Sequence, residues 1–478
     1  MNLALSEQVH LYLLDTAAFY TDVEHEIQSK VNKFYNWITL IEKSISKYDL
    51  DEFKIENAKS CISKYKKNIK KLKEDLKVEM NSNYKIRHLR ETELKDRNVV
   101  SMFESFLTRC IGLSPNEITK DVLIVRTYYY TILKDLVLNG FMFNGEKYVI
   151  LTASAGQIRT KKTVFIKEST WLKHKLTLMC GLTEERISEI NTNKYLAYLA
   201  LCNSATDKWD KFDIDKSIVV DDMELKTRGL VDYIDDKTFD ITRQEMDIEI
   251  NHTDGAGLVL PRVSDKNFMA RLPWVKGLFV VFPYDKFIEK YNCSGKVKDI
   301  YGKEHDIIKD DIQVIFTKSQ FKMWSYYESW DEYKMFFKKY ECEASFCNLE
   351  PTHFKKSKLS YQMLQSLHDI TDDEITILSS TTNETIRNVG KDRKTQLKLL
   401  GLNKSNDNKS YFQKSIESYP ALLTDKYTKE IIKDVKKSFL KSAHAGKLEV
   451  NGFYTFVVQT CMLFVSGYFL ERKNQVVC

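Results

Sequence analysis

The chain has few residues that interrupt regular secondary structure, with 6 prolines and 16 glycines among 478 residues. Its nine cysteines are odd in number and form no CxxC pair. This cysteine usage is typical of a reduced, intracellular protein and argues against a disulfide framework. The N-terminus lacks the basic segment and long apolar core of a signal peptide. We therefore expect a cytoplasmic protein.

Several common catalytic signatures are also missing. The sequence contains no GxxxxGK[ST], GxSxG, HExxH or GxGxxG motif, so the usual P-loop, hydrolase, zinc-protease and dinucleotide fingerprints are excluded. Cys342, Cys347 and His353 cluster loosely but lack a second pair at ligand spacing, and we expect no zinc site. His252 beside Asp254 is interpreted as part of a structural turn rather than as an acid–base pair.

The apolar fraction of 43% is high enough to form packed cores, and 478 residues allow about three domains. The net charge of +6 permits a nucleic-acid partner without requiring one. The pattern predicts an α+β fold. We expect a helical N-terminal region at 1–138, a β-rich central region at 139–330, and a helical C-terminal region at 331–478 with a strand at 447–458 and an atypical apolar tail. Two Asn-Gly steps, at 139–140 and 144–145, predict a hairpin. Polar stretches at 379–383 and 403–409 predict breaks between helices.

Two features of the flanking regions leave alternatives open. Six lysines lie on faces opposite an apolar stripe in the first region: Lys64, Lys66, Lys67, Lys70, Lys71 and Lys73. We interpret them as a solvated face of a helical hairpin, with a phosphate-tracking arm as the alternative. Residues 452–470 carry no charge over 19 positions, which is long enough to span a bilayer, but their polar and aromatic content favours no membrane. A tail anchor is the lesser alternative.

The stretch Asn251–Phe282 differs from the Lys-rich helices around it. It contains three of the sixteen glycines, and half of the six prolines fall between residues 261 and 283. Arg271 and Lys276 flank a Pro273-Trp274 bend between strand-like runs. A compact β unit that presents two cations around a turn is suited to binding phosphates.

Four segments in order carry a resemblance to a known family. They are Ser154-Ala155-Gly156-Gln157-Ile158-Arg159, Asp254-Gly255-Ala256-Gly257, residues 268–277 with the sequence FMARLPWVKG, and Ser319-Gln320-Phe321-Lys322. Together they resemble the first-barrel region of the two-barrel RNA polymerases, which include the cellular RNA-dependent RNA polymerases of RNA silencing and their bacteriophage relatives. The likeness covers roughly residues 139–330. It implies a double-psi β-barrel in the centre of the chain, and a bacteriophage or prophage origin.

The resemblance implies roles for individual residues. Lys276 is expected near the polymerase centre, contacting the incoming nucleotide or primer-end phosphates, with Arg271 in support. Gln157, Arg159 and Lys322 are expected to shape the barrel and its nucleic-acid channel. Asp254, Gly255 and Gly257 are expected to form a structural turn. Gly156 replaces a serine of the family pattern, and Pro273-Trp274 replaces a glycine pair, which puts the backbone approach to a nucleotide in doubt.

The family's DxDGD loop, which holds Mg²⁺ in the second barrel, does not occur in this sequence. From Thr460 the sequence changes character, and we expect a frameshift, an early stop or a split into two chains. The expected function is template-directed RNA synthesis, inactive in this chain alone. The implied partners are an RNA or DNA template, nucleoside triphosphates and a second chain carrying the second barrel. Mg²⁺ is expected for the complete enzyme, with ligands outside this chain. A non-catalytic nucleic-acid-binding protein is the alternative.

Overall fold

The computed structural model of the protein describes residues 8–47, 51–82, 86–115, 117–350, 356–365, 369–402, 409–453, 465, 468 and 469. The chain divides into two compact units, one made of residues 1–349 with 458–478 and the other of residues 350–457. Helices and mixed sheets alternate along the first unit, which confirms the predicted α+β fold. The predicted double-psi barrel and the predicted divisions at residues 138 and 330 stay predictions.

A mixed seven-stranded sheet forms the first half of the first unit, in the order β2-β5-β6-β7-β4-β1-β3. β1 runs parallel to β4 and β2 parallel to β5, while the other pairs are antiparallel. The strands are β1 (Gln8–Asp15), β2 (Arg87–His88), β3 (Val99–Phe103), β4 (Ile118–Arg126), β5 (Phe141–Phe143), β6 (Glu146–Thr152) and β7 (Lys162–Lys167). The structure thus adds four strands to the region expected to be helical, because leucine-rich segments such as β1 suit either structure.

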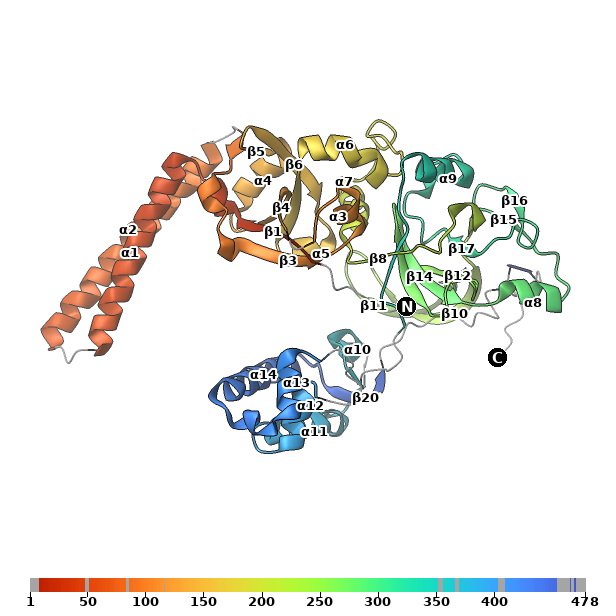
Figure 1. The fold of residues 1–478 in the computed structure, drawn as a ribbon. Coiled ribbons are helices and arrows are strands. Elements are labelled where there is room, and N and C mark those ends of the chain that lie inside the picture. The colour runs from red at the N-terminus through yellow and green to blue at the C-terminus, as the bar shows by residue number, and fades with distance from the viewer. Residues whose placement is uncertain are drawn as a thin grey trace. The chain divides into compact units, whose positions relative to one another are not determined.

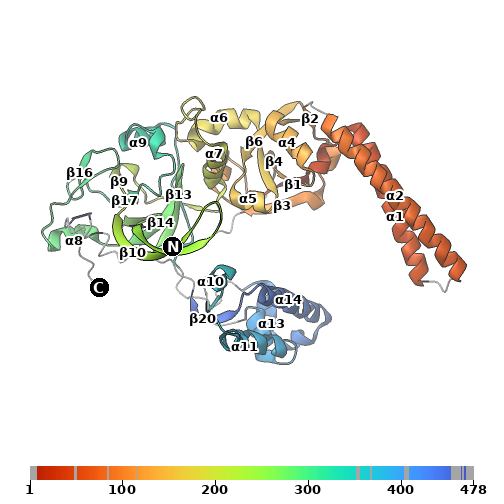
Figure 2. The ribbon, with the colours of Figure 1, turned by 180° about the vertical axis from the view of Figure 1, so that it is seen from behind.

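Helices pack around this sheet and extend beyond it (Figures 1 and 2). They are α1 (Asp22–Lys47), α2 (Glu52–Ser82), α3 (Phe106–Cys110), α4 (Tyr130–Asn139), α5 (Ala155–Arg159), α6 (Glu168–Leu178) and α7 (Thr192–Leu199). α1 and α2 form a long hairpin whose seam buries Val31, Ile38 and Ile69, so the predicted apolar stripe of α2 is confirmed as a packing face. The seam is narrow, and most other side chains of the hairpin are exposed.

The two Asn-Gly steps have different structures. Asn144 (φ 47°) and Gly145 (φ 80°) form the two-residue loop between β5 and β6, and positive φ at both positions is what a type I′ hairpin turn requires. Gly140 (φ 70°) instead ends α4. The hairpin prediction is therefore confirmed at the second step, and the first step is a helix stop.

A second seven-stranded sheet has the order β8-β18-β13-β14-β12-β17-β9. Its strands are β8 (Asp207–Lys208), β9 (Ser217–Val220), β12 (Ala256–Val259), β13 (Phe268–Leu272), β14 (Val275–Val281), β17 (Val314–Thr317) and β18 (Ser345–Cys347). Further elements of this region are the ribbon of β10 (Glu224–Ile234) and β11 (Ile241–Asn251), the pair β15 (Lys296–Lys298) and β16 (Glu304–Asp306), and the helices α8 (Tyr284–Lys290) and α9 (Trp330–Lys339).

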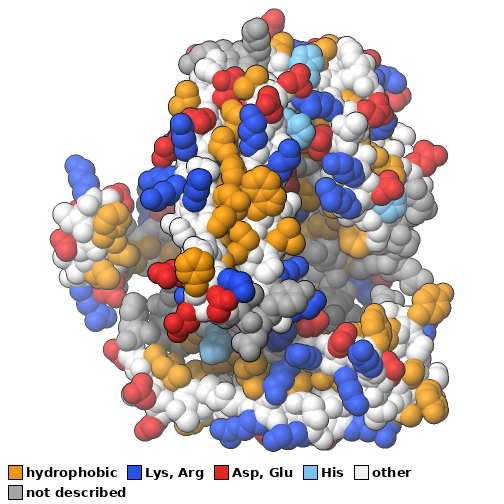
Figure 3. Space-filling view, turned by 90° about the vertical axis from the view of Figure 1, so that its left-hand side faces the viewer, with side chains coloured by type: hydrophobic (Ala, Val, Ile, Leu, Met, Phe, Trp, Pro, Cys, Tyr) orange, Lys and Arg blue, Asp and Glu red, His pale blue; other side chains and the backbone are white. Residues whose placement is uncertain are grey.

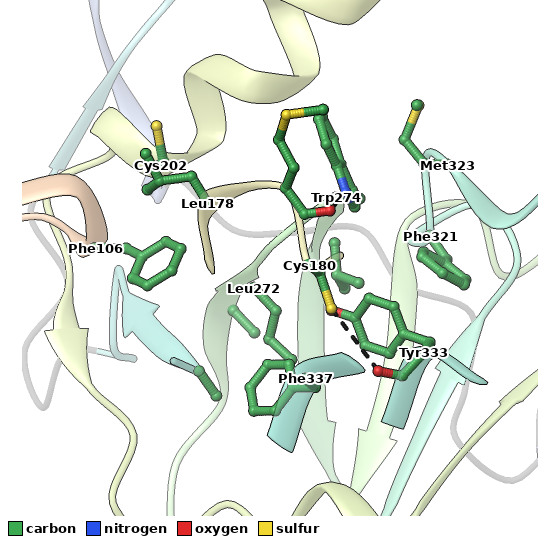
Figure 4. Packing of buried hydrophobic residues seen from close by; sticks show 14 of the residues in the cluster. Phe106, Leu178, Cys180, Cys202, Leu272, Trp274, Phe321, Met323, Tyr333 and Phe337 are labelled. Carbon is green, nitrogen blue, oxygen red and sulfur yellow. Dashed lines mark hydrogen bonds between the residues drawn. The ribbon is translucent and has the colours of Figure 1, made fainter. Parts of the chain in front are cut away.

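A large aromatic core joins the second sheet to α6, α7 and α9 (Figure 4). α9 begins at the N-cap Ser329 and presents Trp330, Tyr333 and Phe337, at helical spacing, to the sheet. The indole of Trp330 donates to the carbonyl of Ser217 at 2.9 Å, so this buried polar group has a partner. The core fixes α9 against the sheet that carries the candidate site.

The second unit is mainly helical. It contains β19 (Lys356–Lys358), α10 (Tyr361–Gln365), α11 (Asp372–Asn388), α12 (Arg393–Leu399), α13 (Tyr411–Ser418), α14 (Lys426–His444) and β20 (Glu449–Phe453). The predicted helix break at 379–383 is wrong, since these residues lie inside α11. The hydroxyls of Ser379 and Ser380 donate to carbonyls of the preceding turn and so fit within the helix.

The other predictions for the C-terminal part fall partly on residues that the structure does not describe. β20 lies within the strand expected at 447–458, and residues 454–458 lie outside the described residues. The expected break at 403–409 is likewise mostly outside them, as is most of the apolar tail. Within the described ranges, no helix is both long and apolar enough to cross a bilayer.

Candidate functional site

The Arg271–Lys276 hairpin is a tight turn held by the aromatic core. β13 and β14 pair up to Leu272 and Val275, which leaves Pro273 and Trp274 as a two-residue loop. Trp274 has a φ of 64°, a conformation in which glycine is usual, and its side chain is 1% exposed. Its indole donates to the carbonyl of Met179 at 2.7 Å, and Tyr333 donates to the carbonyl of Pro273 at 2.9 Å. Burial of the Trp274 side chain (Figure 4) and these two hydrogen bonds hold the turn.

Arg271 and Lys276 lie directly opposite each other across this hairpin. Arg271 is half-buried; its Nη1 donates to the carbonyl of Ala270 at 2.7 Å, and its Nε is buried without a hydrogen-bond partner in the described structure. Burial lowers the pKa of the Arg271 guanidinium. Lys276 is exposed, and its pKa is lowered by partial desolvation, by Arg271 and by Lys322. The hairpin therefore carries positive charge that no described carboxylate neutralises.

Lys322 joins this pair through the backbone. Its N–H donates to the carbonyl of Trp274 at 2.8 Å, and the N–H of Lys276 donates to the carbonyl of Gln320 at 3.0 Å. The Lys322 ammonium donates to the carbonyl of Ser319. Within the described part of the chain, none of Arg271, Lys276 and Lys322 forms an ion pair with a carboxylate. We call these three residues the cation cluster; an anion would neutralise it.

Gln320 explains why two glycines are needed beneath the cluster. Its side chain is fully buried, accepts from the N–H of Thr317 at 3.0 Å and donates to the carbonyl of Leu278 at 3.0 Å. A Cβ on Gly277 would lie 2.1 Å from Gln320 Nε2, and one on Gly257 would lie 2.5 Å from the carbonyl oxygen of Ile315 and 2.7 Å from Gln320 Oε1. The separate DGAG, KG and SQ segments thus form one packed unit.

The turn that contains Asp254 is held by neighbouring residues. Gly255 has a φ of 67°, and its N–H donates to Ser319 Oγ at 2.7 Å. Asp222 accepts from Ser319 Oγ at 2.6 Å and from Thr253 Oγ1 at 3.0 Å. Asp254 itself is exposed and makes no hydrogen bond or ion pair among the described residues. Asp222 was missed by sequence reasoning; its signal was an acidic pair directly after the buried strand β9.

Gln157 and Arg159 lie on α5, between β6 and β7 of the first sheet, whereas Arg271 and Lys276 lie on the second sheet. Gln157 forms a capping box with Ser154: its Oε1 accepts from the N–H of Ser154 at 2.7 Å, while its own N–H donates to Ser154 Oγ at 3.3 Å. Its amide also donates to Thr152 Oγ1 at 3.3 Å. Arg159 is exposed at the end of α5, and its guanidinium contacts no carboxylate in the described structure. Gln157 therefore starts a helix, and Arg159 remains available to a ligand.

The structure also bears on a metal site. Across the described ranges, no group of three or more histidine, cysteine, aspartate or glutamate side chains is placed to hold a metal ion. The side chains of the cation cluster are positively charged and repel Mg²⁺, which takes oxygen ligands such as carboxylates. The described residues therefore do not fit a magnesium centre, and the cluster is suited to anions.

No family model matches the chain. Over 475 residues, which is 98% of the chain, it is 48% identical to the DNA-directed RNA polymerase YonO of Bacillus phage SPbeta. The chain spans 55% of the length of that relative. It is therefore similar, over nearly its whole length, to about half of a phage RNA polymerase.

Proposed function

We propose that the chain takes part in template-directed RNA synthesis and that the cation cluster holds phosphates of a nucleotide or of the growing strand. The observation that carries this proposal is a group of three cations that has no carboxylate partner among the described residues, two on the β13–β14 hairpin and Lys322 hydrogen-bonded to it through the backbone. The similarity to a phage polymerase supports it. Because that relative is named as DNA-directed, a DNA template is favoured, with an RNA template as the alternative.

In this proposal each residue of the cluster has a distinct part. Lys276 is exposed and reaches the phosphate, and Arg271 and Lys322 add fixed positive charge from either side of it. Arg271 has a buried donor still free, so a phosphate oxygen would satisfy it at little desolvation penalty. Arg159 contributes to the nucleic-acid channel, and Gln157 positions it by starting α5. The carboxylates that would hold Mg²⁺ belong to a second barrel outside the described residues.

We expect Lys276→Ala to weaken binding of a nucleoside triphosphate to the full chain by about 10- to 100-fold, because it removes a charge-assisted contact worth about 1.5–3 kcal/mol. Isothermal titration with ATP, with pyrophosphate as competitor, measures the affinity. Lys296→Ala is the matched control, since Lys296 is an exposed lysine already paired with Glu304 at 2.8 Å. Equal affinities for the two variants would refute a phosphate role for Lys276.

The same titration has a pH signature. The pKa of Lys276 lies below the ordinary lysine value of 10.5, because of desolvation and its cationic neighbours. Raising the pH therefore discharges Lys276 earlier than an unperturbed lysine, and ATP affinity should fall in that range. In Lys276→Arg the charge persists, so its affinity should stay flat over the same range. A parallel decline in both proteins would assign the effect to another group.

We also propose that the chain does not polymerise by itself. Purified chain supplied with a primed DNA or RNA template, the four nucleoside triphosphates and Mg²⁺ should give no extended product on a denaturing gel. The reason is that its described residues offer no set of carboxylates for the metal ions. Template-dependent extension by the chain alone would overturn this proposal while leaving the phosphate role of Lys276 open to its own test.

A further inference from the structure

Five lysines of α2 lie on one face of that helix. Lys59, Lys66, Lys70, Lys73 and Lys77 are spaced by seven, four, three and four residues, the repeat that keeps side chains on one side. At about 100° per residue they fall within an arc of about 60° and extend over about 27 Å. All five are exposed. We call them the lysine row.

Contacts with α1 show which side of the hairpin the row occupies. The Lys73 ammonium donates to the Tyr35 hydroxyl at 2.9 Å, so the row adjoins the α1 face that carries Tyr35. Gln28, Asn32 and Thr39 share that α1 face by helical spacing, and hydrogen bonds join Gln28 to Asn32 and Thr39 to the carbonyl of Tyr35. These neighbours are uncharged, while Glu42 also shares this face by its spacing from Tyr35. Among the described residues, no carboxylate of α1 forms an ion pair with the row.

Three carboxylates of α2 lie near the row by helical spacing: Glu52, Glu56 and Glu74. None of the five lysines forms an ion pair with a described carboxylate. Glu74 is four positions from Lys70 and three from Lys77, and on α1 Glu42 is adjacent to Lys43. Figure 3, which looks at the side of the molecule where the hairpin lies, shows lysine and arginine side chains beside a stripe of hydrophobic ones. The hairpin thus presents a strip of five exposed lysines, none of which is ion-paired among the described residues.

We propose that the lysine row binds the phosphate backbone of a nucleic-acid duplex. A straight row of about 27 Å matches about eight base pairs at a rise of 3.4 Å. Proteins that grip single strands stack bases on free aromatic side chains. Here the nearest aromatic of the row, Tyr35, is occupied by Lys73, at 5.2 Å from its ring centre. The choice of a nucleic acid as partner rests on the proposed function; the charge pattern does not.

The hairpin provides its own control. Lys64, Lys67 and Lys71 lie on the opposite side of the same helix, are exposed, and likewise pair with no carboxylate in the described structure. Replacing three lysines on either side removes the same charge from the same helix. We compare Lys66→Ala/Lys70→Ala/Lys77→Ala with Lys64→Ala/Lys67→Ala/Lys71→Ala in the full chain. Equal helical circular dichroism of both variants and the parent checks that the hairpin still folds.

The experiment measures binding of a fluorescent 20-base-pair DNA duplex of arbitrary sequence between 50 and 200 mM salt. Each lost phosphate contact makes the slope of log affinity against log salt shallower by about 0.9. The row variant should therefore lose about 2.7 from its slope, so its salt sensitivity over this range shrinks about 40-fold. The opposite-face variant should keep the parent slope to within about one contact.

Two results would overturn the proposal. Equal slopes for the two triple variants would show that any binding reflects net charge alone. A single-stranded 20-nucleotide competitor that displaces the duplex at equal concentration would show that the row does not select a duplex. Neither result affects the ATP titration of Lys276→Ala, because the lysine row and the cation cluster are probed by different ligands. Conversely, if the polymerase proposal were refuted, the two triple variants could still be compared by their slopes of log affinity against log salt.

Discussion

Replacing Arg87 by alanine is expected to remove about 3–5 kcal/mol from the free energy of unfolding, the largest loss that we predict for a single charged side chain. Arg87 lies in β2 and is 2% exposed. Its Nη1 donates to Glu24 at 2.8 Å, and its Nε donates to Asp135 at 2.8 Å. Nη1 also reaches the carbonyl of Phe19 at 3.1 Å. One guanidinium thus joins α1, β2, α4 and the turn before α1.

The size of the effect comes from what the substitution leaves behind. Glu24 is fully buried, and without Arg87 its carboxylate would stay in the protein interior with only its N-terminal cap contact to Thr21. Removing one partner of a buried pair is far more destabilising than the pair is stabilising, because the other charge cannot be rehydrated. The base of the α1–α2 hairpin should loosen first, since three of the four joined elements meet there.

Urea denaturation followed by tryptophan fluorescence measures this loss, with Arg126→Ala as the matched control. Arg126 forms the same kind of pair with Asp15, at 2.7 Å, but its side chain is 53% exposed. Exposed pairs contribute about 0–1 kcal/mol, so this variant should unfold close to the parent. Similar losses in the two variants would mean that burial does not decide the outcome and would contradict the expectation.

Arg87 also illustrates what the sequence could not reveal about the fold. It stands in a segment of two-residue and three-residue elements, where no periodicity can form, and its partners are 48 and 63 positions away. Long amphipathic helices and strands with β-branched runs were predictable, because each carries its pattern locally. α2 and β9 are examples. β1 was missed because its three leucines suit a helix equally well, and only pairing with β3 and β4 selects the strand.

In the candidate site, too, features with a local sequence pattern were predictable and features that depend on distant contacts were not. The turn at Pro273-Trp274 and the opposition of Arg271 and Lys276 follow from two strands separated by two residues, which the sequence displays. The position of Lys322 could be expected only from the family resemblance. The role of Asp222 was not visible, since its bonds to Ser319 and Thr253 span 97 and 31 residues. Contacts over such separations depend on the order of strands in the sheet.

The lysines of α2 were predictable in number but not in arrangement. The sequence reading grouped Lys64 to Lys73 as one set on the faces away from the apolar stripe. The contact between Lys73 and Tyr35 separates that set into two sides of the helix. Lys59 and Lys77, which were left out, complete the row on one side. The same contact makes the matched control possible, because the remaining lysines lie on the other side.

The second large effect concerns the glycines packed against Gln320. Gly277→Ala should lower the free energy of unfolding by about 2–4 kcal/mol, because its Cβ would overlap the Gln320 side chain and displace a buried amide from its partners. Gln320 Nε2, Cγ and Cδ would lie 2.1, 2.5 and 2.6 Å from the new atom. Gly257→Ala should cause a similar loss, but there the closest atom is the backbone oxygen of Ile315, at 2.5 Å.

This difference in the obstructing atom gives the test. In a Gln320→Ala background, the space beside Gly277 opens, so adding Gly277→Ala should cost little beyond the single Gln320→Ala change. Adding Gly257→Ala should still cost about 2 kcal/mol, since a β-strand backbone cannot move aside as a side chain can. The expected coupling between positions 277 and 320 is thus about 1–3 kcal/mol.

Urea denaturation of the parent, the three single variants and the two double variants completes both cycles. If Gly277→Ala is equally harmful with and without Gln320, the obstruction is not the Gln320 side chain and the packed unit described above is wrong. If Gln320→Ala relieves both glycine positions, the β17 backbone is more compliant than its pairing with β9 and β12 implies. Rescue confined to position 277 would establish that the DGAG, KG and SQ segments are kept together by one buried amide, which fixes the hairpin carrying Arg271 and Lys276.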